Sequence, residues 1–153
     1  MVRPDKIESA LLDTSSLLGV IQGEEEFNCL KSLLAAVDRG EIKLVESTAI
    51  LTEVLPQHAR DNNVHKDARE GIRTLLESPE TQLVDVNTVV ARKAGVLRTE
   101  HGLKTWDAIH LATAILAGVD VLIVRDWRWP NGTFERVYIS RPFDIDDDKL
   151  PIT

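Results

Sequence analysis

The chain has 153 residues, 43% of them hydrophobic and 28% charged, which is the composition of one soluble globular domain of enzyme size. No apolar stretch reaches the roughly 18 residues of a membrane span, the polar N-terminus lacks a signal-peptide pattern, and the single cysteine, Cys29, excludes an internal disulfide. These features predict a cytoplasmic protein without membrane contact, and a formal net charge of −7 argues mildly against a nucleic-acid-binding surface.

Short apolar runs alternate along the chain with segments of helical periodicity. Apolar runs of about four to eight residues indicate buried strands, and apolar residues at steps of about three and four indicate helices. In chain order we expect strand 7–13, helix 15–39, strand 42–47, helix 48–60, helix 64–76, strand 82–86, helix 87–100, helix 105–116, strand 119–124 and a further strand at 136–140. Gly40 and Gly118 follow two of these helices as C-terminal caps do, and Thr105 is a favourable N-cap. Pro56 is expected to bend or interrupt its helix.

Strands that alternate with helices imply the α/β class, with a mainly parallel sheet covered by helices on both faces. We expect four to five strands, with strand 119–124 at the centre because it is the most apolar. Residues 1–143 contain all of these elements and no linker, so they are expected to form a single domain. Residues 144–153 are expected to form an acidic C-terminal tail.

Four acidic residues stand at the ends or faces of these elements. Asp13 closes the first strand and Asp126 follows the fourth, while Asp107 lies in the first turn of one helix and Glu53 lies on another. In open parallel sheets the functional crevice lies beyond the carboxyl ends of the strands, where such side chains meet. Clustered carboxylates raise one another's pKa unless a cation is present, and all-oxygen ligands favour Mg²⁺ or Mn²⁺ over zinc. The pattern predicts a metal site that activates water against a phosphodiester.

Three segments resemble the PIN-domain family: LLDTSSL (11–17), STAILTEVL (47–55) and GLKTWDAIHLATAILAGVDVLIVRD (102–126). The last is the most specific, because an acid opens a helix of small residues and the strand that follows ends on an acid. The similarity covers roughly residues 7–140. It implies a PIN-like three-layer α/β/α fold and an endoribonuclease that uses Mg²⁺ or Mn²⁺ to hydrolyse RNA. Small members are commonly VapC-like toxins of toxin–antitoxin pairs, so the resemblance also implies an antitoxin protein partner and a homodimer.

By position, the resemblance implies four catalytic and metal-binding residues: Asp13, Glu53, Asp107 and Asp126. The first three would hold one cation, and Asp126 would complete its shell or position water. Thr14 and Ser15 match the hydroxyl-bearing positions beside the first acid, where they would orient it. The chain departs from the family at Val124, because many members have Ser or Thr two residues before the last acid.

Strand-end acids also occur in other proteins. A catalytically weak PIN fold that binds RNA or protein is the main alternative, because a fold does not guarantee activity. A receiver-type phosphoacceptor needs a pair of adjacent acids near the first strand, where only Asp13 is found. A haloacid-dehalogenase-like phosphatase needs a second Asp where Ser15 stands.

Three further residues have both a functional and a structural interpretation. Trp127 and Trp129 follow the last acid, where they would stack on the bases of a single strand or cover the sheet edge or a dimer contact. His110 stands one helical turn after Asp107, so it either approaches the site or is a hydrogen-bonded structural residue. The sequence leaves these alternatives open.

Overall fold

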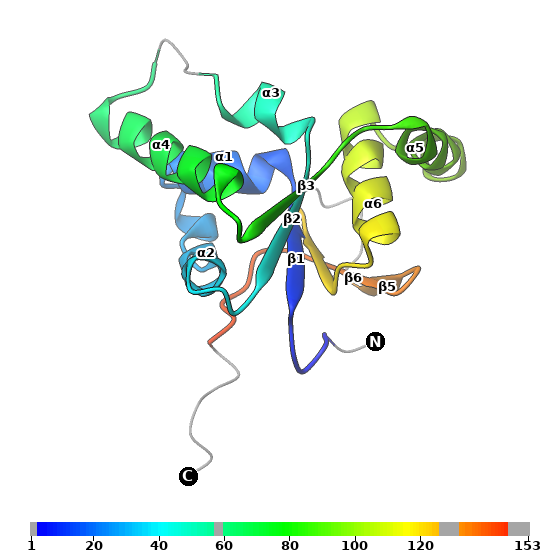
Figure 1. Ribbon diagram of the computed structural model, residues 1–153, viewed down its shortest axis with the longest axis horizontal. Helices are drawn as coiled ribbons and strands as arrows, with labels where there is room; N and C mark the ends of the chain where they lie inside the picture. Colours follow the sequence, from blue (N-terminus) through cyan, green and yellow to red (C-terminus); the bar gives the residue numbers. More distant parts are fainter. Residues whose placement is uncertain (1–2, 57–59, 126–131, 147–153) are drawn as a thin grey trace.

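A mainly parallel six-stranded sheet with helices on both faces forms the centre of the part of the chain that the structure describes (Figure 1). The computed structural model describes residues 3–56, 60–125 and 132–146. The strands are β1 (Ser9–Leu12), β2 (Lys43–Ser47), β3 (Thr81–Val84), β4 (Val121–Ile123), β5 (Gly132–Phe134) and β6 (Val137–Ser140). The helices are α1 (Thr14–Gln22), the short 3-10 helix η1 (Glu25–Phe27), α2 (Leu30–Asp38), α3 (Ile50–Val54), α4 (Asn63–Glu77), α5 (Thr88–His101) and α6 (Thr105–Ala117).

The strand order is β3-β2-β1-β4-β6-β5, which places β1 and β4 at the centre of the sheet. Every neighbouring pair is parallel except β5 and β6, which are antiparallel. Helices α1, α2 and α4 cover one face, and α5 and α6 cover the other (Figure 1). The α/β class, the three layers and the central place of strand 119–124 are therefore confirmed. Because five strands run in the same direction, their carboxyl ends lie at one edge of the sheet.

The sheet has one strand more than the sequence pattern predicts, because β5 gives no strand signal. A tight turn at Glu135 and Arg136 joins β5 to β6, and both residues have left-handed backbone angles, with φ of 44° and 71°. Such turns are usually marked by Asn-Gly or Asp-Gly, which are absent at these positions. An ion pair of 2.9 Å between Lys93 of α5 and Glu135 supports the turn.

Two of the expected helices are shorter than predicted. The segment 15–39 is divided into α1, η1 and α2, because Gly23 adopts a left-handed φ of 69° and ends α1. The apolar spacing continues across this break, since Phe27 returns to the core, and the pattern alone does not reveal the division. Of the expected helix 48–60, the structure shows α3, which ends at Val54 ahead of Pro56, and residues 57–59 lie outside the described residues. No helix within the described ranges combines the length and apolar character that crossing a membrane requires.

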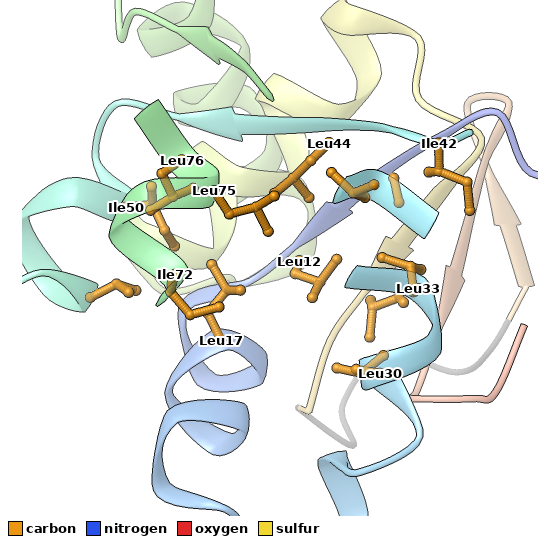
Figure 2. Close-up of a cluster of buried hydrophobic side chains, with 14 of the residues drawn as sticks. Leu12, Leu17, Leu30, Leu33, Ile42, Leu44, Ile50, Ile72, Leu75 and Leu76 are labelled. Atoms are coloured by element: carbon orange, nitrogen blue, oxygen red, sulfur yellow. The ribbon is translucent and has the colours of Figure 1, made fainter. Parts of the chain in front are cut away.

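Each face of the sheet has its own apolar core. The core under α1, α2 and α4, which we call the α1–α2–α4 core, contains mostly large aliphatic side chains (Figure 2). The members of this core that Figure 2 labels are Leu12, Leu17, Leu30, Leu33, Ile42, Leu44, Ile50, Ile72, Leu75 and Leu76. Small residues are prominent in the core under α5 and α6, which includes Ala94, Ala108, Ala112 and Ala114. Small side chains allow close approach of packed elements, which brings α6 close to α5 and to the sheet.

The middle of α1 is fixed to the α1–α2–α4 core by close contact with Phe27. A β-carbon at Gly19 would lie 2.2 Å from Cδ2 of Phe27, whose side chain is fully buried. Leu17 and Ile21, on the same helix, are also buried. The contact holds α1 against the sheet, with the start of the helix at the carboxyl end of β1.

Candidate active site

Asp13 is anchored where β1 ends and α1 begins. Its Oδ1 accepts the backbone N–H of Ser16 at 2.8 Å, as an N-cap does, and its own N–H donates to the carbonyl of Ile123 in β4 at 3.0 Å. The residue is only 6% exposed. Burial is the main influence on the carboxyl and raises its pKa, hydrogen bonds from Ser16 oppose this shift, and the charge of Asp107 adds to it. Asp13 is therefore held in place and lies within electrostatic range of Asp107.

Asp13 shares one cleft with two other predicted acids, Glu53 and Asp107. The cleft has a volume of about 290 Å³ and is lined by Asp13, Thr14, Ser15, Leu18, Glu53, Lys104, Trp106, Asp107 and His110. Glu53 comes from α3, and Asp107 from the first turn of α6. The end of β1, the short α3 after β2 and the start of α6 meet at this edge of the sheet, so they bring together side chains that are far apart in sequence. Thr14 and Ser15, the two predicted hydroxyl residues, line the same cleft.

The fourth predicted acid, Asp126, lies outside the described residues, as do Trp127 and Trp129. Within residues 3–56, 60–125 and 132–146, no three His, Cys, Asp or Glu side chains are arranged to hold a metal ion. The chemistry of the cleft fits a hard divalent cation, because carboxylates and hydroxyls line it together. A cation bound by three of the described carboxylates would require them to approach one another more closely.

Glu46 of β2 is a further carboxyl group near Asp13, and the sequence pattern does not single it out. Its side chain is fully buried, and its Oε1 accepts the backbone N–H of Leu12 at 3.0 Å. Its Oε2 has no hydrogen-bond partner among the described residues. Burial raises the pKa of Glu46 well above its ordinary value, the Leu12 bond opposes this, and the charge of Asp13 reinforces it. An acid within an interior parallel strand is the signal that would have identified it, because such strands are buried on both faces.

His110 of α6 both reaches the cleft and has a structural hydrogen bond, so the two interpretations of this residue are compatible. Its Nε2 lies 3.1 Å from Oγ1 of Thr14, and the side chain is 2% exposed. Within the described chain, Nδ1 has no partner. Burial lowers the pKa of His110 to about 4, so the imidazole is neutral near pH 7. The neutral ring links α6 to the residue that follows Asp13.

Lys104 and Trp106 line the cleft on either side of Thr105, and neither is among the predicted site residues. Both are exposed, the Trp106 side chain to 44%. Lys104, and not the expected Thr105, is the N-cap residue of α6, and its side chain forms no capping hydrogen bond. Their nearness to Asp107 in the sequence is the signal that would have pointed to them.

The PIN-domain family model matches residues 10–137 of the chain. Because this match covers most of the sequence, the chain belongs to the PIN-domain family. The family assignment confirms the resemblance seen in the three sequence segments. No curated protein matches the sequence.

Solved structures of toxin–antitoxin assemblies have a similar fold. A toxin–antitoxin complex from Klebsiella pneumoniae matches with 24% identity and a TM-score of 0.59, over 88% of this chain and 98% of that chain. DNA-bound VapBC from Salmonella typhimurium matches with 15% identity and a TM-score of 0.58, over 87% and 98%. VapBC2 from Rickettsia felis, bound to a promoter DNA fragment, matches with 16% identity and a TM-score of 0.54, over 77% and 88%. At these identities the similarity concerns the fold.

Proposed function

We propose that the protein is a metal-dependent endoribonuclease that hydrolyses RNA phosphodiester bonds, and that it is the toxin of a toxin–antitoxin pair. The observation that carries the proposal is the shared cleft of Asp13, Glu53 and Asp107 in a PIN-family chain. Bringing like charges together costs free energy, as the effect of Asp107 on the pKa of Asp13 indicates. A bound cation would offset that cost, and cation binding therefore explains why three carboxylates share one cleft.

Asp13, Glu53 and Asp107, together with Asp126, are the proposed ligands of Mg²⁺ or Mn²⁺. When bound, such a cation lowers the pKa of water and stabilises negative charge on a phosphate. Asp13 needs little reorganisation for this role, because Ser16 and Ile123 already fix its position. Thr14 and Ser15 line the cleft, where their hydroxyls would orient the carboxylate or the substrate. Neutral His110 holds Thr14 in position without adding charge.

An antitoxin protein is the proposed partner, and a homodimer is the proposed state in the cytoplasm. The similar solved structures are named as toxin–antitoxin or VapBC assemblies, which supports a partner of this kind. A protein that covers the cleft would need positive charge to complement the three carboxylates. Expression of the chain alone should therefore arrest growth, and Asp107→Asn should abolish the arrest. Growth arrest that persists in the folded Asp107→Asn protein would separate toxicity from the cleft.

RNA cleavage by the purified protein is the direct test of the nuclease proposal. Cleavage should require Mn²⁺ or Mg²⁺, stop with EDTA, and be lost in a folded Asp107→Asn variant. Asp38→Asn is the matched control, because Asp38 is an exposed acid at the end of α2 and does not line the cleft. If neither structured nor single-stranded RNA is cleaved and calorimetry detects no metal binding, the chain is better described as a PIN-fold module that binds RNA or protein.

A further inference from the structure

We propose that Arg69, paired with Asp61, is a positioning residue for Glu53, because it fixes the carboxyl end of the short helix that carries this carboxylate into the cleft. The inference rests on the proposed nuclease function, in which Glu53 is a metal ligand. It deepens that function by naming two residues on which the metal site depends, although neither of them lines the cleft. We call Arg69, Asp61 and the backbone carbonyl of Val54 the α3 anchor.

Helix α3 is held weakly by its own hydrogen bonds. It has only five residues, and Ala49 at its N-cap makes no side-chain hydrogen bond. Helices of this length are marginal in isolation, because ordering the first turn costs free energy and the last carbonyls lack partners within the helix. Ile50 and Val54 are fully buried and fix one side of the helix. Glu53 lies in the last turn, so its placement depends on what holds the carboxyl end.

Arg69 of α4 reaches the carboxyl end of α3. Its Nη1 donates a hydrogen bond to the carbonyl of Val54, the residue that follows Glu53. Its Nε donates to Oδ2 of Asp61 at 3.1 Å, and its Nη2 donates to Oδ1 of the same carboxylate at 3.4 Å. A planar guanidinium with several fixed donors is suited to hold two acceptors at once. The anchor therefore joins α4, the residue that precedes its N-cap and the end of α3.

The anchor is buried, whereas a second arginine pair on the same helix is exposed. The side chains of Arg69 and Asp61 are 3% and 4% exposed. Arg73, one turn further along α4, is 40% exposed and pairs with the exposed Glu70 at 3.4 Å. A buried ion pair adds little net stability compared with apolar residues of similar volume, so its distinctive effect is to fix a geometry. In this structure the geometry that it fixes is the end of α3.

A fixed end of α3 favours metal binding, because a cation binds best to ligands that are already in place. The carboxylates of the cleft have to approach one another before three of them can share a cation. While the anchor holds the backbone, only the side chain of Glu53 has to be ordered, which costs less free energy than ordering backbone and side chain together. Without the anchor, part of the free energy of metal binding would be spent on re-forming the last turn of α3.

The test uses a neutral replacement of the buried pair, Arg69→Met with Asp61→Leu, in the full chain. Removing both side chains leaves no unpaired buried charge, and the net charge stays at −7. Arg73→Met with Glu70→Leu makes the same exchange at the exposed pair of α4 and is the matched control. If the neutral variant does not fold, Arg69→Lys serves in its place, because it keeps the charge but lacks the planar fork that holds both acceptors.

Hydrogen exchange in EDTA examines the anchor without a metal. A peptide that spans α3 should exchange about tenfold faster in the neutral variant, while peptides from β1 and α2 keep their wild-type protection. The control should leave all three peptides unchanged. A uniform loss of protection would mean that the pair stabilises the whole fold, and unchanged exchange in α3 would mean that the pair does not hold this helix. Either result would overturn the inference.

Calorimetry with Mn²⁺ tests whether the anchor acts through Glu53. The neutral variant should bind Mn²⁺ about tenfold more weakly than the wild type, as happens when the support of a metal ligand is removed. In a Glu53→Gln background, where the charged ligand is already missing, the same exchange should cost almost no further affinity. A purely structural role would not produce this dependence on Glu53. An equal loss in both backgrounds, or no loss in either, therefore refutes the positioning role.

The outcomes separate this inference from the nuclease proposal. If the wild type and the neutral variant bind Mn²⁺ and cleave RNA equally well, the anchor has no positioning role and the nuclease proposal stands. If the wild type binds no Mn²⁺, the nuclease proposal fails, and hydrogen exchange alone decides the inference. Loss of protection confined to α3 would then support the anchor, and any other pattern would overturn it.

Discussion

Helix α1 contributes residues both to the cleft at the carboxyl edge of the sheet and to the α1–α2–α4 core, and the two groups of residues have different roles. Thr14 and Ser15, at the start of α1, line the cleft beside Asp13. One turn later, Leu17 and Gly19 are buried in the core. Substitutions a few residues apart should therefore separate an effect on RNA cleavage from an effect on the stability of the fold.

The largest effect is expected for Asp13→Asn, which should lower RNA cleavage by about a thousandfold. The amide Oδ1 can still accept the Ser16 N–H, so the cap of α1 is kept. Removing a charge near Asp107 also relieves repulsion, and the melting temperature should be unchanged or higher. Single-turnover cleavage and thermal unfolding of the same preparation check both statements. Metal-dependent cleavage by a folded Asp13→Asn protein would refute the assignment.

His110 should make the stability of the protein sensitive to acid. Its pKa is lowered to about 4 in the folded protein, so the unfolded chain binds more protons below its ordinary value of 6.5. The free energy of unfolding should thus fall as the pH drops from 6.5 to about 4, by up to about 3 kcal/mol. His110→Gln should flatten this slope in urea titrations at several pH values. An unchanged slope in that variant would show that other groups cause the acid sensitivity.

Gly19→Ala should destabilise the fold without altering the chemistry of the cleft. The added β-carbon would meet the buried ring of Phe27 at 2.2 Å, and such overpacking costs about 2 kcal/mol. Gly71→Ala is the matched control within α4, because a β-carbon added there would meet nothing within 4 Å. That substitution should raise stability by about 0.5 kcal/mol. Equal urea midpoints for both variants would contradict the close packing of α1.

The smallest change below about pH 4.3 is expected for Glu46→Gln, because Glu46 and Gln are then both neutral, and its effect lies in the pH profile. The pKa of Glu46 is raised in the folded protein, so the folded state holds a proton that the unfolded chain releases. Wild-type stability should therefore decline as the pH rises above the ordinary glutamate value of about 4.3. Gln stays neutral and still accepts the Leu12 N–H, so the decline should be weaker in the variant. A steeper decline in Glu46→Gln would contradict the raised pKa.

The order of strands and helices is largely predictable from the sequence, and the exceptions have local causes. Apolar runs identify β1, β2, β4 and β6 because interior parallel strands need little else. Gly23 divides an expected helix without interrupting its apolar spacing. β5 is only three residues long and is joined to β6 by a turn without glycine. It therefore has neither an apolar run of strand length nor the usual hairpin-turn residues.

The cleft is predictable to the extent that parallel strands bring their carboxyl ends together. Asp13 and Asp107 follow from that rule and from the family resemblance. Glu46 is not predicted because the rule selects acids that follow the end of a strand, whereas Glu46 lies within β2 and is fully buried. Trp106 is not predicted as a cleft residue, because its position in the sequence does not indicate that the ring is exposed beside the cleft.

The insertion of β4 between β1 and β6 also governs when the protein becomes capable of acting. β1 leaves the ribosome well before its central partner β4, which follows the helix that bears Asp107. Contacts between such distant segments form late in folding. A nascent chain would therefore carry Asp13 and Glu53 before the start of α6, which bears Asp107, is in place beside them. Any molecule that recognises the complete cleft must then act on finished protein, and its supply would have to keep pace with folding rather than with translation.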